Sequence, residues 1–180
     1  RDRWERALGE RPESEPGDSD PWPKNLPADL EDVSVAIART YPARDNLSEI
    51  REVEKLFLDS ITAAQNFIYI ENQYFTSGII GDALAERLDE ENGPEIVLVL
   101  PRRCSGWLEE STMGVLRYQI LQKMREADKH GRLRAYYPVS GKDTPVMVHA
   151  KTMVIDDCFL RIGSANLSNR SLGTDIECDL

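Results

Sequence analysis

The sequence predicts an α/β domain built on a mixed, largely parallel sheet that is flanked by helices on both faces. Short apolar segments rich in β-branched residues alternate along the chain with segments whose apolar residues recur every three or four positions. Such alternation of strands and helices favours a layered domain with parallel pairing. The segment EIVLVLP, residues 95–101, is apolar almost throughout, which is typical of a strand buried on both faces.

Residues 1–30 differ in composition from the rest of the chain. The first nine residues read RDRWERALG and predict the last turns of a helix that a glycine ends. Pro, Glu, Asp and Ser then dominate up to about residue 30, a composition that opposes both helix and sheet. We therefore expect residues 1–30 to be a linker preceded by the end of a helix, and residues 31–180 to form the globular part of the chain.

The first elements of the globular part follow from local patterns. Residues 33–40 are predicted to form a buried strand that ends at a Tyr-Pro pair. Residues 45–65 carry apolar side chains at helical spacing, and a second helix over 79–93 is closed by Asn-Gly-Pro. Between these two helices, NFIYIENQYF (66–75) alternates and is rich in aromatic and β-branched residues, which predicts a strand running into a loop.

The second half of the domain continues the same alternation. After the strand at 95–101, a long helix is expected over residues 107–131. The residues predicted to line its inner face are Met113, Leu116, Ile120 and Met124. A strand follows over 133–139, then a loop, then an extended segment over 147–156 and one more strand. Catalytic groups in such sheets collect in the loops beyond strand ends.

Composition limits the classes of function. The chain has 32 acidic and 22 basic residues, and its net charge of −10 does not favour long-range attraction of nucleic acid or anionic lipid. Its apolar runs are too short to span a bilayer. Three cysteines without paired spacing indicate neither a disulfide framework nor a zinc site, and we expect all three to be buried hydrophobes. These are Cys104, Cys158 and Cys178.

The segment MVHAKTMVID holds the most informative pattern. Side chains two residues apart in a strand share a face, so His149 and Lys151 are predicted to lie side by side. Imidazole can act as nucleophile or proton carrier, and an ammonium group can neutralise a phosphate. Ser164 and Asn166 follow the next strand and can donate to phosphoryl oxygens. Glu177 could accept the other ring N–H of His149 and fix its tautomer. The pattern predicts a phosphate-handling site without a metal or other cofactor.

At this point the residues resemble a known family. The pattern His-x-Lys-x-x-x-x-Asp over residues 149–156, followed by Gly-Ser-x-Asn over 163–166, is similar to the signature of the phospholipase D superfamily. The segment IYIENQYF, residues 68–75, resembles the one ahead of the second signature in two-signature, lipid-cleaving members. The likeness extends from about residue 32 to residue 180. It implies that residues 31–180 are a phospholipase D-like catalytic half-domain and that residues 1–30 are a linker and the tail of a preceding half-domain.

The resemblance also implies a mechanism. One signature histidine attacks phosphorus and forms a phosphohistidine, while the other protonates the leaving alcohol and then activates water or a second alcohol. His149 lies in the second signature, which implies the acid–base role. Asp156 completes the signature and is expected to brace the segment locally. The resemblance implies that Lys151, Ser164 and Asn166 bind phosphate. It also implies that Glu177 orients the histidine, and Gln73 is a candidate for lining the site.

The chain departs from the two-signature pattern because it holds only one signature. Its other histidine, His130, has no lysine, serine or asparagine at matching offsets and is expected at a helix end, where a cation is favourable. We therefore expect the nucleophilic histidine in a missing N-terminal half, and we expect the isolated chain to be inactive. A homodimer that pairs two copies of the signature is the alternative.

The sequence thus predicts a phosphodiesterase that hydrolyses or transfers the phosphatidyl group of a phospholipid, with water or an alcohol as acceptor. Peripheral membrane contact and a cytoplasmic or membrane-associated location are expected, and nucleic acid is not an expected partner. Three alternatives stay open: a cardiolipin synthase-type phosphatidyltransferase, a nuclease-type phosphodiesterase and a non-catalytic membrane-recruitment domain. A basic groove lined with aromatic residues on the face of the site would favour the nuclease.

Overall fold

The structure is a computed structural model of the 180-residue chain, and it describes residues 2–11, 13, 17, 22–23, 25–44, 47–103 and 110–180. Two compact units divide the chain, Arg1–Ser34 and Val35–Leu180. The first unit contains helix α1 (Asp2–Leu8), which Gly9 ends with a left-handed φ of 76°. The predicted helix with a glycine at its end is therefore confirmed.

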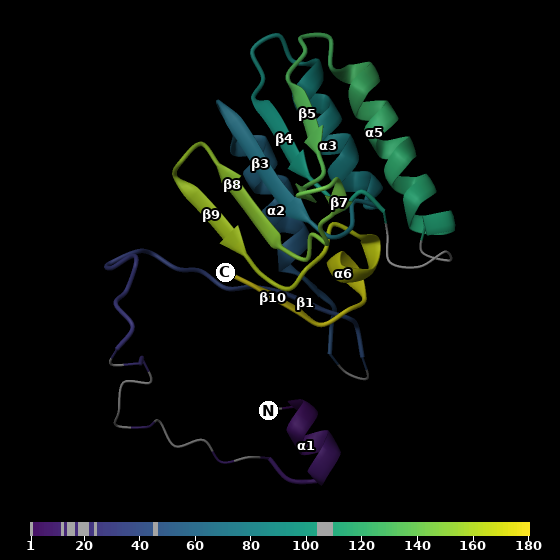
Figure 1. Cartoon of the computed structure of the whole chain (residues 1–180). Helices are drawn as coiled ribbons and strands as arrows, with labels where there is room; N and C mark the ends of the chain where they lie inside the picture. The colour runs from purple at the N-terminus through teal and green to yellow at the C-terminus, as the bar shows by residue number, and fades with distance from the viewer. Residues whose placement is uncertain are drawn as a thin grey trace. The chain divides into compact units, whose positions relative to one another are not determined.

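A five-stranded sheet forms the centre of the second unit (Figure 1). Its strands, in spatial order, are β5 (Leu133–Tyr136), β4 (Glu95–Val99), β3 (Phe67–Asn72), β8 (Lys151–Ile155) and β9 (Phe159–Ile162). Strands β5, β4 and β3 are parallel to one another, whereas β8 and β9 each pair antiparallel. The α/β fold with a mixed sheet, predicted from the sequence, is confirmed.

Helices α2 (Glu52–Ala63), α3 (Gly78–Asp89) and α5 (Val115–Ala127) cover the sheet. Strand residues in register across β3, β4 and β8 are buried together on one face, and they share a core with these helices. Residues on the other face, such as Tyr69 and Val97, are partly exposed. The described helices that build this core thus lie on one face, whereas the sequence predicted helices on both, because apolar β4 suggested burial on both sides.

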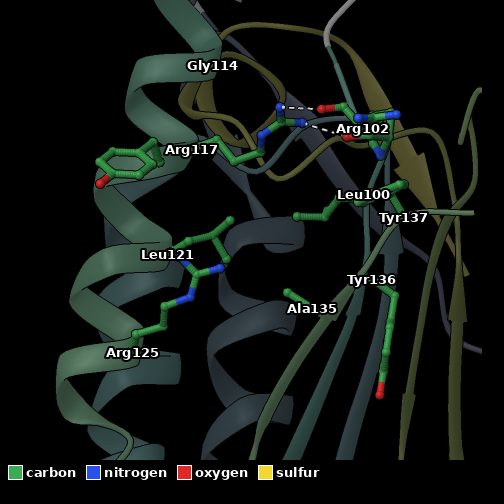
Figure 2. Close-up of a pocket in the computed structure, with 11 residues that line it drawn as sticks. Leu100, Arg102, Gly114, Arg117, Leu121, Arg125, Ala135, Tyr136 and Tyr137 are labelled. Atoms are coloured by element: carbon green, nitrogen blue, oxygen red, sulfur yellow. Dashed lines mark hydrogen bonds between the residues drawn. The ribbon is translucent and has the colours of Figure 1, made fainter. Parts of the chain in front are cut away.

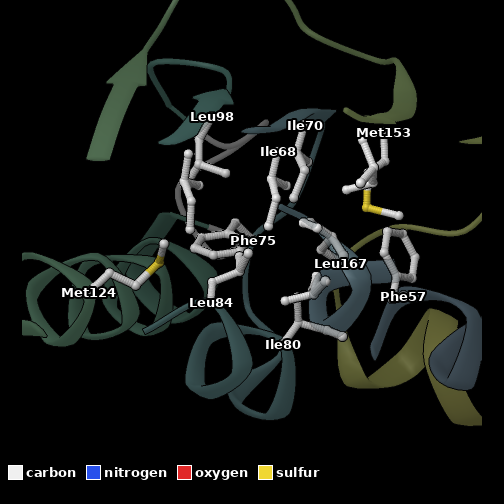
Figure 3. Close-up of a cluster of buried hydrophobic side chains, with 14 of the residues drawn as sticks. Phe57, Ile68, Ile70, Phe75, Ile80, Leu84, Leu98, Met124, Met153 and Leu167 are labelled. Carbon is white, nitrogen blue, oxygen red and sulfur yellow. The ribbon is translucent and has the colours of Figure 1, made fainter. Parts of the chain in front are cut away.

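One continuous hydrophobic core joins the helices to the sheet (Figure 3). Phe57 and Ile61 of α2, and Leu84 of α3, are almost fully buried against the strands. Met124 of α5 closes the same cluster. Each of these side chains contributes about 1.5–3 kcal/mol through burial. This core fixes the strand ends from which the candidate site projects.

A second, smaller sheet lies beside the first and contains β10 (Glu177–Asp179), β1 (Ala38–Tyr41) and β2 (Ile50–Arg51). The predicted buried strand over 33–40 is wrong in its first half, because only its end forms β1. The apolar residues before β1 are exposed by more than half of their surface, and these are Val33, Val35 and Ile37. Two-residue strands β6 (Val139–Ser140) and β7 (Thr144–Pro145) form a short hairpin.

Two further predictions need correction. The long helix begins at Val115 after the π-helical turn η1 (Glu110–Gly114), and Leu116 on its predicted inner face is 46% exposed. Residues 104–109, which include Cys104 and the predicted start of this helix, lie outside the described residues. Cys158 and Cys178 are exposed rather than buried, because each lies in a turn or an edge strand. Of the described helices, none has the length and apolar character that a bilayer span requires.

Candidate active site

The candidate site lies at the edge of the five-stranded sheet where β3 ends. Because β8 runs antiparallel to β3, its first residue, Lys151, pairs with Asn72, the last residue of β3. The Lys151 Nζ donates to Gln73 Oε1 at 3.3 Å and to the His149 carbonyl oxygen at 3.0 Å. The structure therefore brings together the predicted lysine and the predicted lining glutamine, which are 78 residues apart in sequence.

The electrostatic environment of Lys151 matches a partly buried cation. Burial of the ammonium group lowers the pKa of Lys151, the carboxylate of Glu177 opposes this shift, and the positive charge of Arg161 adds to it. The net shift is downward. A cation that has lost part of its hydration interacts more strongly with an anion than one in bulk water.

Ser164 and Glu177 are joined directly. The Ser164 hydroxyl donates to Glu177 Oε2 at 2.5 Å and accepts the backbone N–H of Cys178 at 3.1 Å. A hydroxyl has one proton to donate, so the Ser164 proton is directed at Glu177 rather than at the space beside Lys151. The sequence instead paired Glu177 with the ring of His149, and that contact is not formed in this structure.

His149 lies just before β8 and is exposed. Strand alternation therefore does not fix its side chain relative to Lys151, as the sequence pattern had assumed. Within the described ranges, no residue forms a hydrogen bond with the His149 ring, while its carbonyl oxygen is held by Lys151. The His149 residue is exposed to solvent, and no described side chain forms a hydrogen bond that would set the tautomer of its ring.

Asn72, a residue that the sequence did not single out, joins the end of β3 to the loop of the Gly-Ser-x-Asn motif. It is fully buried, and its Oδ1 accepts the backbone N–H of Tyr74 at 3.1 Å and of Leu167 at 3.2 Å. Its Nδ2, and the Oδ1 of the predicted Asn166, are buried without a hydrogen-bond partner among the described residues. A buried polar atom left unpaired costs about 1–3 kcal/mol; the unpaired Asn72 atom is a donor and the unpaired Asn166 atom is an acceptor, so only the Nδ2 of Asn166 could donate to a phosphoryl oxygen.

Beneath the site lies a buried ion pair that the sequence also did not single out. The guanidinium of Arg161, on β9, is fully buried, and its Nε donates to Asp179 Oδ2 at 2.9 Å. Its Nη atoms donate to the carbonyl oxygens of Lys151 (3.2 Å) and Ala165 (3.1 Å). The same group lies 4.2 Å from the centre of the Phe57 ring. Arg161 thus binds the start of β8 and the motif loop at once.

Asp179 holds the other side of the motif loop. Its Oδ1 accepts the backbone N–H of Ser164 at 2.9 Å and of Ala165 at 3.2 Å. A Cβ built on Gly163 would lie 1.7 Å from this oxygen, so only glycine allows the carboxylate to approach so closely. A sequence signal for the pair exists: Arg161 occupies an inward position of β9, where alternation predicts an apolar residue.

Asp156, the last signature residue, lies at the opposite end of β8. Its carboxylate accepts the backbone N–H groups of Gln65 (2.6 Å), Asn66 (2.7 Å) and Phe67 (2.8 Å). Burial works to raise the pKa of Asp156, but these three donors and the positive charge of Arg87 outweigh it and lower the pKa. Asp156 therefore holds the start of β3 and lies away from the cluster around Lys151.

A pocket of about 400 Å³ opens at the same sheet edge, beyond the ends of β4 and β5 and beside α5 (Figure 2). Its polar lining consists of arginines and tyrosines, which are Arg102, Arg117, Arg125, Tyr118, Tyr136 and Tyr137. No three His, Cys, Asp or Glu side chains gather as metal ligands in the part of the chain that the structure describes.

The structure is an α/β domain with a mixed sheet. Lys151 of the signature, Gln73 and the Gly-Ser-x-Asn loop lie near the end of β3. Residues 57–180 match the family described as "Cardiolipin synthase, PLD-like domain". The chain therefore belongs to the phospholipase D superfamily, as the signature indicated.

Known relatives carry the phospholipase D name. Phospholipase D C of Dictyostelium discoideum is 28% identical over 151 residues, which cover 67% of this chain and 9% of the relative. Phospholipase D zeta 1 of Arabidopsis thaliana is 30% identical over 168 residues, covering 69% of this chain and 15% of the relative. The chain thus spans a small part of the length of these curated relatives.

Solved structures share the fold. The phospholipase D family member Nuc of Salmonella typhimurium superposes with a TM-score of 0.59 at 16% identity, over 81% of this chain and 80% of that chain. The phosphatidylserine synthase of Haemophilus influenzae gives a TM-score of 0.57 at 18% identity, over 80% of this chain and 33% of that one. At these identities the likeness concerns the fold.

Proposed function

We propose that the chain is a catalytic half-domain of a phospholipase D-type phosphodiesterase that hydrolyses or transfers the phosphatidyl group of phospholipids. The observation that carries this proposal is the Lys151 ammonium held beside Gln73 at the strand edge, with the exposed His149 immediately before it. A phosphoryl group bound by this ammonium would have an accessible imidazole as its neighbour.

Each step assigns a defined task to this chain. A histidine outside the chain attacks phosphorus, the bond from phosphorus to the leaving alcohol breaks, and His149 gives its proton to the departing oxygen. His149 then takes a proton from water or from an acceptor alcohol, whose oxygen bonds to phosphorus as the bond to the nucleophilic nitrogen breaks. Lys151 and the Asn166 amide stabilise the charged phosphoryl oxygens. Ser164 joins them when its hydroxyl turns away from Glu177.

The reaction needs a second histidine, which we place in a half-domain outside this sequence. The isolated chain is then inactive, and pairing of two copies is the alternative way to assemble a site. Asp156 has no chemical step in this scheme, because its carboxylate is engaged by three backbone N–H groups.

The lipid substrate is favoured by relatives that are named phospholipases D. A cardiolipin synthase-type transfer differs only in the acceptor alcohol, and the family match is consistent with it. A nuclease is the second candidate, because the pocket at the same edge is basic and lined with tyrosines. A non-catalytic membrane-recruitment domain has less support, because it gives no reason to keep a partly buried lysine beside an exposed histidine.

The test uses the longer protein that contains this half-domain, with phosphatidylcholine and a primary alcohol as substrates. We expect a transferred phosphatidyl product, and we expect His149→Asn to abolish it without changing the circular dichroism spectrum. His130→Asn, in the turn between α5 and β5 and away from the site, is the matched control and should keep full activity. Undiminished transfer by His149→Asn would remove the assigned role, and cleavage of single-stranded DNA without any lipid product would favour the nuclease.

A further inference from the structure

The pocket beyond β4 and β5 shares an edge with the candidate active site. Strand β4 pairs with β3 so that Val99 lies opposite Glu71, and β3 pairs with β8 so that Asn72 lies opposite Lys151. Neighbouring strands are spaced by roughly 4.8 Å, which puts the end of β4 about 10 Å from the start of β8. One ligand of ordinary phospholipid size can therefore reach both places.

The pocket is strongly basic in an acidic chain. Its three guanidinium groups belong to Arg102, Arg117 and Arg125, and no acidic residue is among its described lining residues. In the described ranges, none of the three forms an ion pair with a carboxylate. Arg117 donates to the carbonyl oxygens of Pro101 (2.9 Å) and Arg102 (3.4 Å), as Figure 2 shows. Three uncompensated positive charges create a local potential that favours an anion, despite the net charge of −10.

The other walls indicate which kind of anion fits. Leu100, Leu121 and Ala135 contribute apolar surface, and Tyr118, Tyr136 and Tyr137 are also among the lining residues. A guanidinium presents paired donors that match a phosphate, and apolar walls suit the carbon skeleton of a phosphate ester. A volume of about 400 Å³ is within the usual range for small-molecule sites. The lining therefore matches a phosphate ester of a small alcohol better than a bare inorganic ion.

A nucleic acid strand fits the pocket less well. Binding of such a polyanion depends on several phosphates at once and is opposed by the acidic remainder of the chain. Stacking of bases needs free aromatic faces, and the ring of Tyr137 already has the Arg102 guanidinium 5.3 Å from its centre.

We propose that this pocket is a second phosphate site, which binds a glycerophosphate group of the substrate or of the acceptor while the reacting phosphate lies against Lys151. The proposal deepens the proposed function and rests on it for the reacting phosphate, whereas the binding step can be measured without turnover. Arg102, which lies over the Tyr137 ring, and Arg125, which donates to Gln122 Oε1 at 3.1 Å, keep further N–H groups and are assigned as the phosphate ligands. Arg117 supports the loop by holding its carbonyl groups.

The experiment measures binding to the 180-residue chain by calorimetry and by NMR of the arginine side chains, in a Lys151→Met background that removes the first phosphate site. The probes are sn-glycerol 3-phosphate, dihexanoyl phosphatidylglycerol below its micelle concentration, inorganic phosphate and a short single-stranded oligonucleotide. Arg102→Gln with Arg125→Gln should weaken binding of both glycerophosphate probes by roughly tenfold to a hundredfold, as expected for lost hydrogen bonds to a charged group. Arg134→Gln removes one charge from an exposed position of β5 outside the pocket and should change nothing.

The outcomes separate the possibilities. Preference for the lipid over free glycerol 3-phosphate assigns the site to a lipid-borne group, and the reverse assigns it to a soluble acceptor. Equal affinity for inorganic phosphate, tighter binding of the oligonucleotide, or no loss in the double variant relative to Arg134→Gln would each overturn the proposal. Arginine-dependent glycerophosphate binding in a protein that performs no phosphatidyl transfer would leave this site standing and refute the proposed function.

Discussion

Replacing Arg161 by methionine is expected to test how the site is supported. The variant keeps a long, flexible side chain on β9 but removes the guanidinium that links Asp179 to the carbonyl oxygens of Lys151 and Ala165. The carboxylate of Asp179 then remains buried without its positive partner, since both side chains are fully buried. We expect the Gly-Ser-x-Asn loop and the start of β8 to lose their common support.

The magnitude follows from burial. Removing one partner of a buried ion pair costs about 3–5 kcal/mol, because the remaining charge is not compensated. Domains of this size unfold with a free energy of about 5–15 kcal/mol, so the variant should be close to its limit of stability. Arg170→Met is the matched control: its ion pair with Asp175 has the arginine side chain 76% exposed, and such pairs contribute about 0–1 kcal/mol.

The assay is urea unfolding of the 180-residue chain, followed by circular dichroism, on four proteins: wild type, Arg161→Met, Asp179→Asn and the double variant. Removing both charges should recover part of the loss, so the double variant should be more stable than the sum of the two single effects predicts. A coupling of about 1–3 kcal/mol is expected for groups in direct contact. Additive effects, or a loss in Arg161→Met no larger than in Arg170→Met, would refute the assigned support.

Two further outcomes are expected from the charges around the site. Because the folded-state pKa of Asp156 is lowered, its contribution to stability is present above the ordinary aspartate pKa of about 3.9 and is lost as the pH falls through the folded-state value. The free energy of urea unfolding of Asp156→Asn should therefore depend less on acid pH than that of Asp157→Asn. Equal dependence would contradict the role of Asp156 in holding the start of β3. Because Glu177 opposes the downward shift at Lys151, Glu177→Gln should lower the pKa of Lys151 further in NMR titration of the lysine Cε, whereas Glu90→Gln should leave it unchanged. A rise in the Lys151 pKa would contradict the assigned proximity.

Local patterns were sufficient to predict most of the fold. Helical spacing identified α2 and α3, alternation identified β3, and a continuous apolar run identified β4, because burial leaves a trace in the sequence. The exposed valines and isoleucine before β1 escaped this reasoning, since an apolar segment has the same composition whether or not a partner covers it. The sequence also did not show that these helices cover one face of the sheet. The covered face depends on how the connections between strands run and not on the strand sequences themselves.

Of the candidate site, the sequence predicted the residue types but not all of their contacts. The sequence assigned Lys151 and Gln73 to one site, and in the structure the two side chains form a hydrogen bond. The bond between Ser164 and Glu177 was not predicted, because it depends on the pairing of β10 with β1, a contact between segments about 140 residues apart. Asp179 was missed for the same reason, as a short edge strand carries little periodic signal.

The spacing of the signature has a geometric explanation in the antiparallel strand β8. Lys151 begins this strand at the edge where the parallel strands end, and Asp156 directly follows its last residue at the opposite edge. Five residue steps along a strand cover about 17 Å, which is the width that β3 spans between its capped N-terminal end and Asn72. The aspartate therefore fixes the start of β3 through three backbone N–H groups while the lysine faces its end. Asp156 itself lies in a turn with a left-handed φ of 50°, so the length of β8, rather than strand alternation, sets the distance between the lysine and the aspartate.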